Sequence, residues 1–218
     1  MKMRRYLLGA GLLVIIGMGG ACSHWSRNRS EHKTGKEVGK AISGKVHFAD
    51  QLALFDKKQV ALGELALRKS SDPQVRAFAH ELIENHQQHY ATLQTYADAS
   101  ALRLAAIDLS MEEGVGGAGK VGATESINKA SAKYDEKLDK QEGEFKAQLR
   151  GLSAKSGRDF DKAFLEQVEK DQKWGQELVD KGLKEYADDG SLALLLGRSA
   201  PIFARQREHA KALKESIV

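Results

Sequence analysis

The sequence predicts an all-α fold, an antiparallel four-helix bundle with a long crossover that carries an extra charged helix. Only two prolines interrupt 218 residues rich in Ala, Leu, Lys, Glu and Gln, the residues that lose least on entering a helix. Four long stretches place apolar residues three and four positions apart, so each presents an apolar stripe to a core. Hydrophobic residues make up 41% of the chain, which is enough for one folded domain, expected over 46–218.

Residues 1–22 have the layout of an export signal. Basic residues open the segment, an apolar stretch covers 6–18, and three small residues precede Cys22. The apolar stretch is too short to span a hydrocarbon layer of about 30 Å comfortably, so a cleaved signal is favoured over a retained anchor.

Cys22 is the only cysteine, so an intramolecular disulfide is excluded. Small residues directly before a lone cysteine resemble the lipobox of bacterial lipoproteins. The resemblance implies that Cys22 is acylated and becomes the first mature residue, and Ser23 after it resembles lipoproteins sorted to the outer membrane, facing the periplasm. Gly19 stands where the lipobox usually has leucine, so two alternatives stay open. These are cleavage after Ala21 to give a soluble periplasmic protein, and an inner-membrane anchor.

Residues 23–45 are polar, are punctuated by glycine and show no sustained apolar period, so they predict a flexible tether. The chain carries a formal charge of +4, and three of its positive charges belong to the leader, so the mature chain is nearly neutral. A near-neutral chain lacks the field that dominates nucleic-acid affinity, and nucleic acid is therefore excluded as a partner. Neither a G-x-S-x-G turn nor a glycine phosphate loop is present, so hydrolase and nucleotide-binding functions find no support.

The first two helices are predicted from their stripes and from the signal between them. The first covers about 46–70, and Asp72 with Pro73 supplies an N-cap and a first-turn proline for a second helix that returns antiparallel to it. The stripe of the first helix consists of Leu52, Phe55, Gln59, Leu62 and Ala66. The stripe of the second consists of Val75, Ala79, Leu82, His86, His89 or Tyr90, and Leu93.

The crossover begins with a loop over 104–124, whose glycines at 114–124 disfavour regular structure. Residues 126–156 then predict a charged helix lying on the bundle. Gly157 ends it, and Asp159 is the expected N-cap of the next helix, whose stripe consists of Phe160, Phe164, Val168, Gln172, Gly175, and Val179 or Leu178. A turn at 189–191 leads into the last helix, from Leu192 with an expected kink at Pro201, whose stripe consists of Ile202, Gln206, His209, Leu213 and Ile217.

Each of the four long helices carries a polar side chain near the middle of its apolar stripe: Gln59, His86, Gln172 and His209. Gln59 lies 13 residues before Asp72 and His86 lies 14 after it, so both sit about 20 Å from the turn along antiparallel helices. We therefore expect one buried polar centre, in which these side chains hydrogen-bond one another or buried water. A further group, His80, His86 and His89 with Glu84, could capture zinc or copper, but a solvated helix face is favoured.

The segments VALGELALRKSSDPQVRAFAHELIENHQQH and SGRDFDKAFLEQVEKDQKW, with the late REHAKAL, resemble the bacterial envelope family known as domain of unknown function 4142. The resemblance covers 48–100 and 143–214. It implies a ferritin-like bundle in an outer-membrane protein, within a family that has no settled activity. Residues 105–142 are longer and richer in glycine than the usual connection, so the resemblance implies nothing about the crossover.

Three positions depart from the family pattern, which usually has glutamate at position 59, Asp-His at 85–86 and Asp-His at 171–172. A ferritin-like di-iron centre also needs Glu-x-x-His motifs, and the second helix lacks one. The sequence therefore favours a non-catalytic envelope protein without a cofactor. It would be attached to the membrane by its lipid and would bind another envelope or cell-wall component, or serve in stress. The alternative is a metal-binding or redox protein that holds a single divalent ion through His86 and His209.

Overall fold

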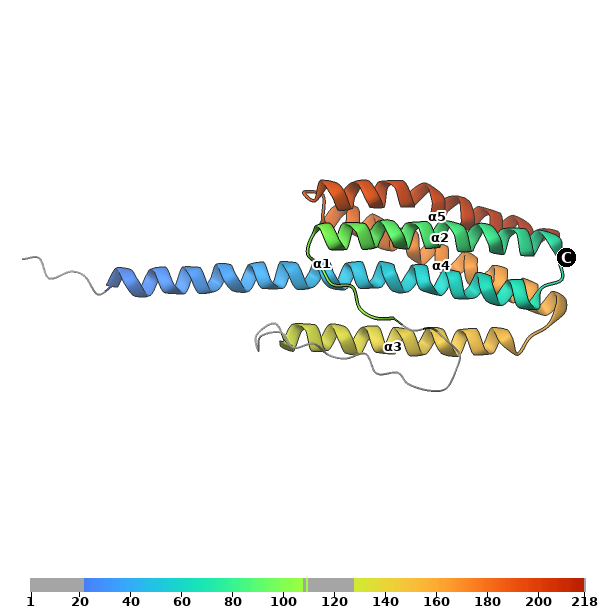
Figure 1. The fold of residues 1–218 in the computed structure, drawn as a ribbon, viewed down its shortest axis with the longest axis horizontal. Coiled ribbons are helices and arrows are strands. Elements are labelled where there is room, and N and C mark those ends of the chain that lie inside the picture. The colour runs from blue at the N-terminus through green and yellow to red at the C-terminus, as the bar shows by residue number, and fades with distance from the viewer. Residues whose placement is uncertain (1–21, 108, 110–127, 218) are drawn as a thin grey trace, which may run out of the picture. The chain divides into compact units, whose positions relative to one another are not determined.

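The computed structural model describes residues 22–107, 109 and 128–217, which include five α-helices. The predicted leader and the predicted glycine-rich loop at 114–124 lie outside the described residues. The chain divides into two compact units, residues 1–39 and 40–218, and the second is the helical bundle. Its helices are α1 (Cys22–Lys69, which begins in the first unit), α2 (Pro73–Ala99), α3 (Asn128–Ser153), α4 (Gly157–Glu185) and α5 (Gly190–Ser216). No strand occurs among the described residues, and the predicted all-α bundle is confirmed (Figure 1).

Helix α1 begins at Cys22, so the prediction of an irregular tether over 23–45 is wrong. Its glycines each cost a helix about 1 kcal/mol, but Lys, Arg, Glu and Ala around them are strong helix formers. The end of this segment also packs on the bundle, because Lys45 Nζ forms an ion pair with Asp189, 2.7 Å from its Oδ2. No helix among the described residues carries an apolar run long enough to cross a membrane.

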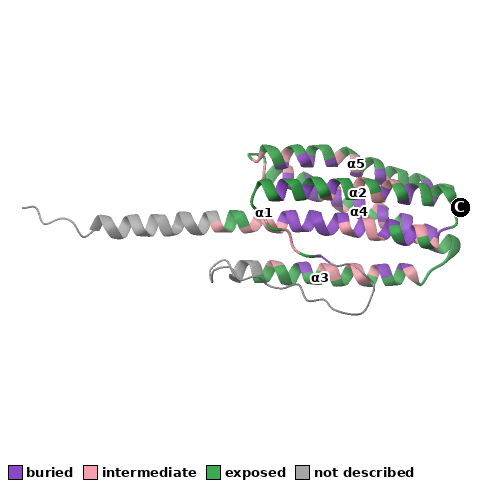
Figure 2. Cartoon of the chain, in the orientation of Figure 1, coloured by how far each residue is buried: buried purple, intermediate pink, exposed green. Residues whose placement is uncertain are grey.

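Within the bundle, α1 is the central helix. From Phe48 to Gln59 every residue except Lys57 is buried, so this stretch is covered on all sides rather than on one stripe (Figure 2). Its contacts reach α2 through Asp56, α5 through Phe55, and both α3 and α4 through Lys58. A helix enclosed in this way must satisfy its polar side chains inside the protein.

Local capping explains where the other helices begin. The carboxylate of Asp72 accepts the backbone N–H groups of Gln74 and Val75 at 2.8 and 3.1 Å, which confirms the predicted N-cap of α2. Asp189 caps α5 by accepting the N–H of Leu192 at 3.0 Å, so α5 begins two residues earlier than predicted.

The start of α4 differs from the prediction. Ser156 is the N-cap residue, and Asp159 lies in the first turn of the helix, where its charge favours the N-terminal end of the helix dipole. Gly157 is the first residue of α4 and not a break before it, with a φ of +55° that glycine adopts without strain. Pro201 lies inside α5.

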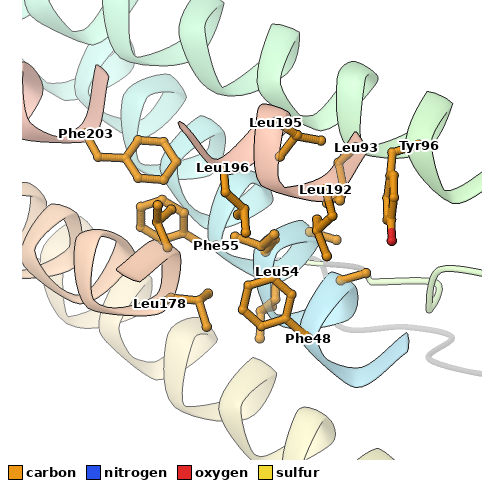
Figure 3. Close-up of a cluster of buried hydrophobic side chains, with 14 of the residues drawn as sticks. Phe48, Leu54, Phe55, Leu93, Tyr96, Leu178, Leu192, Leu195, Leu196 and Phe203 are labelled. Carbon is orange, nitrogen blue, oxygen red and sulfur yellow. The ribbon is translucent and has the colours of Figure 1, made fainter. Parts of the chain in front are cut away.

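Phe48 and Phe55 of α1 lie in the buried core (Figure 3), and each packs against a glycine of α4. Gly175 faces the ring of Phe55, and Gly182 faces the ring of Phe48. Residues seven apart lie two turns apart on the same face of a helix, so the two contacts repeat along one antiparallel seam. The seam continues to Lys58 and Gln59, which meet Asp171.

Helix α3 is the extra charged helix of the crossover. Among its residues whose burial is described, only Leu138, Leu149 and Leu152 are buried, and all the others are exposed or half-buried (Figure 2). It is therefore attached through a narrow apolar edge and a few polar contacts, among them the hydrogen bond from Lys58 Nζ to Gln148 Oε1 at 2.8 Å.

The chain after α2 runs as an irregular strap beside α1. The carboxylate of Asp50 accepts the N–H of Ala105 at 2.7 Å, and Lys57 Nζ donates to the carbonyl of Ile107 at 2.7 Å. Burial raises the pKa of Asp50 to about 6, although the hydrogen bond from Ala105 acts in the opposite direction. The buried surroundings of Asp50 therefore disfavour its ionised form.

We expect Asp50→Asn to remove a pH dependence of stability. Because the folded pKa of about 6 lies above the unfolded value, ionisation of Asp50 destabilises the native state as pH rises from about 4 to 6. Asparagine keeps an acceptor for Ala105 but cannot ionise. Relative to the wild type, the free energy of unfolding of the variant should rise by up to about 3 kcal/mol between pH 4 and pH 7.5, as measured by urea unfolding. Asp98→Asn, at an exposed position, is the control, and equal pH profiles for Asp50→Asn and the wild type would contradict the assignment.

Candidate functional site

The centre of the bundle holds a carboxylate shared by two histidines. Asp56 of α1 has no exposed surface, and its Oδ1 lies 2.8 Å from Nδ1 of His86 while its Oδ2 lies 2.6 Å from Nδ1 of His89. Both histidines come from α2, three positions apart, so they present their rings on one face of that helix. Each carboxylate oxygen therefore fixes the orientation of one imidazole.

The other side of the His86 ring meets two glutamine amides. Its Nε2 lies 3.0 Å from Oε1 of Gln206 on α5 and 2.9 Å from Nε2 of Gln172 on α4. The ring is held between two aromatic side chains: Phe203 stacks on it with centroids 5.4 Å apart, and Phe55 meets it edge-on at 5.1 Å. Phe55 and Phe203 also touch each other (Figure 3). His86 is thus fixed in an aromatic slot and has no exposed surface.

A second buried ion pair continues the network. Nε2 of Gln172 lies 3.3 Å from Oε1 of Gln59, and Gln59 donates to Asp171 Oδ2 at 3.2 Å. The other oxygen of Asp171 accepts from Lys58 Nζ at 2.7 Å and from Gln167 at 2.8 Å. Hydrogen-bonding groups therefore run without a gap from His89, through Asp56 and His86, to Lys58 beneath α3.

The electrostatics of Asp56 and His89 follow from their contact. Burial alone would raise the pKa of Asp56, but the charges and hydrogen bonds of the two histidines outweigh burial and hold it below its usual value. Burial would lower the pKa of His89, but the charge of Asp56 and the hydrogen bond to it raise the pKa above its usual value. Asp56 and His89 therefore favour the ionised pair. This contribution to stability is lost as pH falls through the folded pKa of Asp56 or rises through that of His89.

Lys58 is the cation of the second pair. Burial lowers its pKa, partly offset by the charge and hydrogen bond of Asp171. Its ammonium also lies 3.9 Å from the centre of the Phe145 ring on α3, where the negative face of the ring attracts it. Both buried carboxylates at the centre thus already have their own counter-charges.

Three of the four predicted members of the polar centre come together. Gln59, His86 and Gln172 are fully buried and in contact, whereas His209 is not part of the centre. The side chain of His209 is 43% exposed, and its Nδ1 lies 3.3 Å from the carboxylate of Glu81. Gln206, one turn earlier in the same stripe, takes the place predicted for His209.

The prediction of a solvated face for His89 is also wrong, because this side chain is buried against Asp56, while His80 is exposed as expected. Sequence reasoning missed Asp56 and Lys58 because charged side chains are expected in water. Asp56 lies four residues after Leu52 and three before Gln59, a helical spacing that could have signalled its burial, whereas Lys58 has no such signal. Their burial follows from α1 being enclosed on all sides.

The donor set of the centre does not fit a di-iron site. Two cations need several free carboxylates, but the centre offers amides and two imidazoles, and the oxygens of Asp56 and Asp171 are already engaged by cationic or hydrogen-bonding side chains. His86 and His209 do not share a site, since both ring nitrogens of His86 have other partners. Among the described residues, no three His, Cys, Asp or Glu side chains are grouped to hold a metal ion.

A pocket of about 390 Å³ lies between α1, α2 and the strap, next to this centre. Asp56 contributes to its wall, so the buried cluster lies close to a space that solvent can enter. The wall consists of Asp56, Lys57, Val60, Ala61, Glu64, Gln87, Tyr90, Ile107 and Leu109. A second hollow of about 650 Å³ shares Lys57 and Tyr90 with it and extends along α2 beside the strap.

Comparison with known proteins gives one family match. The family model described as a domain of unknown function, DUF4142, matches residues 33–213, which is most of the chain and includes the whole buried network from His89 to Lys58. Neither the curated proteins nor the solved structures contain a significant match. The chain therefore belongs to the DUF4142 family.

Proposed function

We propose that this protein is an exported, lipid-anchored protein of the bacterial cell envelope, held at the outer membrane and facing the periplasm. Its helical bundle has a non-catalytic role, either binding another envelope component or serving in stress. The anchor is supported by the basic and apolar leader and by the small residues before Cys22.

The non-catalytic part of the proposal is supported by the buried centre, in which each carboxylate has a cationic partner within the chain. Asp56 is neutralised by His89, and Asp171 is neutralised by Lys58 at 2.7 Å. Both ring nitrogens of His86 are occupied as well. Groups engaged in this way hold helices together, and a metal or a substrate would first have to break buried hydrogen bonds.

The anchor is tested at Cys22. In a bacterium that processes lipoproteins, the wild-type chain should yield a mature N-terminus with an acylated cysteine, detected by mass spectrometry, and should fractionate with membranes. Cys22→Ser should carry no lipid and leave the membrane fraction or keep its leader. Ser23→Ala, the neighbouring change, should behave like the wild type. An unmodified Cys22 in the wild type would contradict the proposal.

The metal content tests the role of the bundle. Protein purified without chelator should contain substoichiometric metal, and chelator should leave its melting temperature unchanged, because the buried charges are balanced within the chain. The opposite result, a stoichiometric ion whose removal by chelator lowers the melting temperature, would favour the metal-binding alternative.

A further inference from the structure

The two hollows beside the strap join into one groove. The smaller, of about 390 Å³, lies between α1, α2 and the strap, and the larger, of about 650 Å³, follows α2 beside the strap. Lys57 and Tyr90 line both hollows, so the hollows meet at these two side chains. On α2 the lining residues run from Gln87 to Asp98, which is about 16 Å along the helix axis.

The smaller hollow is the apolar end of this groove. It is lined by Val60 and Ala61 of α1, by the ring of Tyr90 of α2, and by Ile107 and Leu109 of the strap. All of these side chains except Ile107 are only half-buried, so apolar surface in this hollow still faces water. Hydrocarbon that fills the hollow would remove this surface from water, which is favourable. The smaller hollow therefore suits an apolar chain.

The larger hollow is the polar end of the groove. Gln94, Thr95 and Asp98 of α2 and Arg103 of the strap contribute to its wall, and all four are exposed. The charges of Asp98 and Arg103 offset each other within this hollow. A charged headgroup can therefore stay hydrated here and still meet hydrogen-bonding side chains.

Lys57 stands where the two hollows meet, and its charge is not balanced by an ion pair. Its side chain is half-buried, and its Nζ donates to the carbonyl of Ile107 at 2.7 Å and lies 5.4 Å from the centre of the Tyr90 ring. Within the described part of the chain, no carboxylate forms an ion pair with Lys57. An ammonium carries three N–H donors and Ile107 accepts one, so Lys57 can still donate to a group in the groove.

The two carboxylates that line the smaller hollow do not cancel this charge. Asp56 is already paired with His89, with 2.6 Å between Oδ2 and Nδ1. Glu64 is exposed and lies seven positions after Lys57, about 10 Å along the axis of α1, where salt screens much of its charge. An anionic group at the junction of the hollows would therefore meet Lys57 as an uncompensated cation.

We propose that the groove binds a single-chain anionic amphiphile, such as a fatty-acid carboxylate, with its apolar chain in the smaller hollow and its anionic head at Lys57. A cationic head would be repelled by Lys57, and a small anion without a chain would leave the apolar hollow in contact with water. The inference rests on the non-catalytic binding role proposed above and names the class of its ligand. It does not involve the buried centre.

Photo-crosslinking of the full chain in nanodiscs of zwitterionic phosphatidylcholine tests the site. The probe is decanoate with a diazirine in its chain, and mass spectrometry of peptides maps the adducts. We expect adducts on the apolar wall, at Val60, Ala61, Ile107 or Leu109. Excess plain decanoate should abolish them, whereas decyltrimethylammonium and acetate should not. Equal competition by the cation, or adducts spread over the exposed helix faces, would overturn the proposal.

Two variants test the head and the chain separately. Lys57→Met keeps an unbranched side chain without the charge, and it should raise the decanoate concentration for half-maximal competition at least about tenfold, the effect of one charge-assisted hydrogen bond. Lys57→Arg should retain most of the affinity. Lys173→Met, at an exposed position of α4, is the control and should bind decanoate like the wild type.

Ala61→Phe should fill the smaller hollow and abolish the adducts while leaving Lys57 in place. Ala204→Phe, at an exposed position of α5, is its control, and circular dichroism shows whether each variant is folded. If folded Lys57→Met and Ala61→Phe proteins both bind decanoate as tightly as the wild type, the groove is not the site. That result together with an acylated Cys22 would remove the amphiphile and leave the proposed anchored envelope protein standing.

Discussion

Replacing Asp56 with alanine is expected to lower the free energy of unfolding by about 3–5 kcal/mol. The carboxylate is the partner of both His86 and His89, and both imidazoles are buried, so water does not readily replace it. Removing it leaves two buried ring nitrogens without an acceptor and leaves the charge of His89 without its counter-charge. In a chain of this size the melting temperature should fall by roughly 10 °C or more. Urea unfolding followed by circular dichroism measures the free energy of unfolding.

The control for this variant is Asp180→Ala, which removes an exposed carboxylate from α4 and should change stability by no more than about 0.5 kcal/mol. Asp56→Asn should fall between the two, because the amide oxygen can accept from only one of the two histidines at its best geometry. An Asp56→Ala variant as stable as Asp180→Ala would mean that the shared carboxylate does not hold the centre together.

The second large effect is expected at the glycines of α4. A Cβ at Gly175 would lie 2.5 Å from Cζ of Phe55, and a Cβ at Gly182 would collide with the ring of Phe48 and with Leu196. Phe55 cannot move aside easily, because Trp174, Phe203 and His86 surround it. Each glycine-to-alanine change should therefore destabilise the protein by about 1–3 kcal/mol, although alanine favours the helix itself.

The matched control makes the same chemical change where space is open. Gly143 of α3 is exposed, and a Cβ added there would meet no described atom within 4 Å, so Gly143→Ala should stabilise the protein by about 0.5–1 kcal/mol. If glycine-to-alanine changes raise the free energy of unfolding in α3 and lower it in α4, measured in one series of denaturant titrations, packing is identified as the cause. Stabilisation by Gly175→Ala would contradict the close packing of α1 against α4 at this seam.

The helix starts that depend on local chemistry were predictable. Asp72 with Pro73 and the turn at Asp189 act through neighbouring backbone N–H groups, so a short window of sequence contains their whole cause. The beginning of α1 was not predictable in this way. Glycines suggested a tether there, whereas the helix formers between them and the ion pair from Lys45 to Asp189 favour a helix.

The buried centre was predictable only where it interrupts an apolar stripe, as at Gln59, His86 and Gln172. The choice between Gln206 and His209 depends on a rotation of α5 about its axis, which sequence periodicity does not fix to within one residue. Asp56 and Lys58 were missed for a different reason. An amphipathic pattern implies one buried face with charged residues in water, whereas α1 contacts four other helices and buries charges as well.

The amide of Gln59 has an implication for how this sequence can vary. It donates to Asp171 with one atom and is approached by Gln172 with the other, so it needs both a donor and an acceptor. A carboxylate there would set two negative charges against each other, and relief would require a new residue at position 171 or 172. Substitutions at Gln59, Asp171 and Gln172 are therefore expected to be coupled, because a neutral amide at position 59 places no second negative charge beside the buried Asp171.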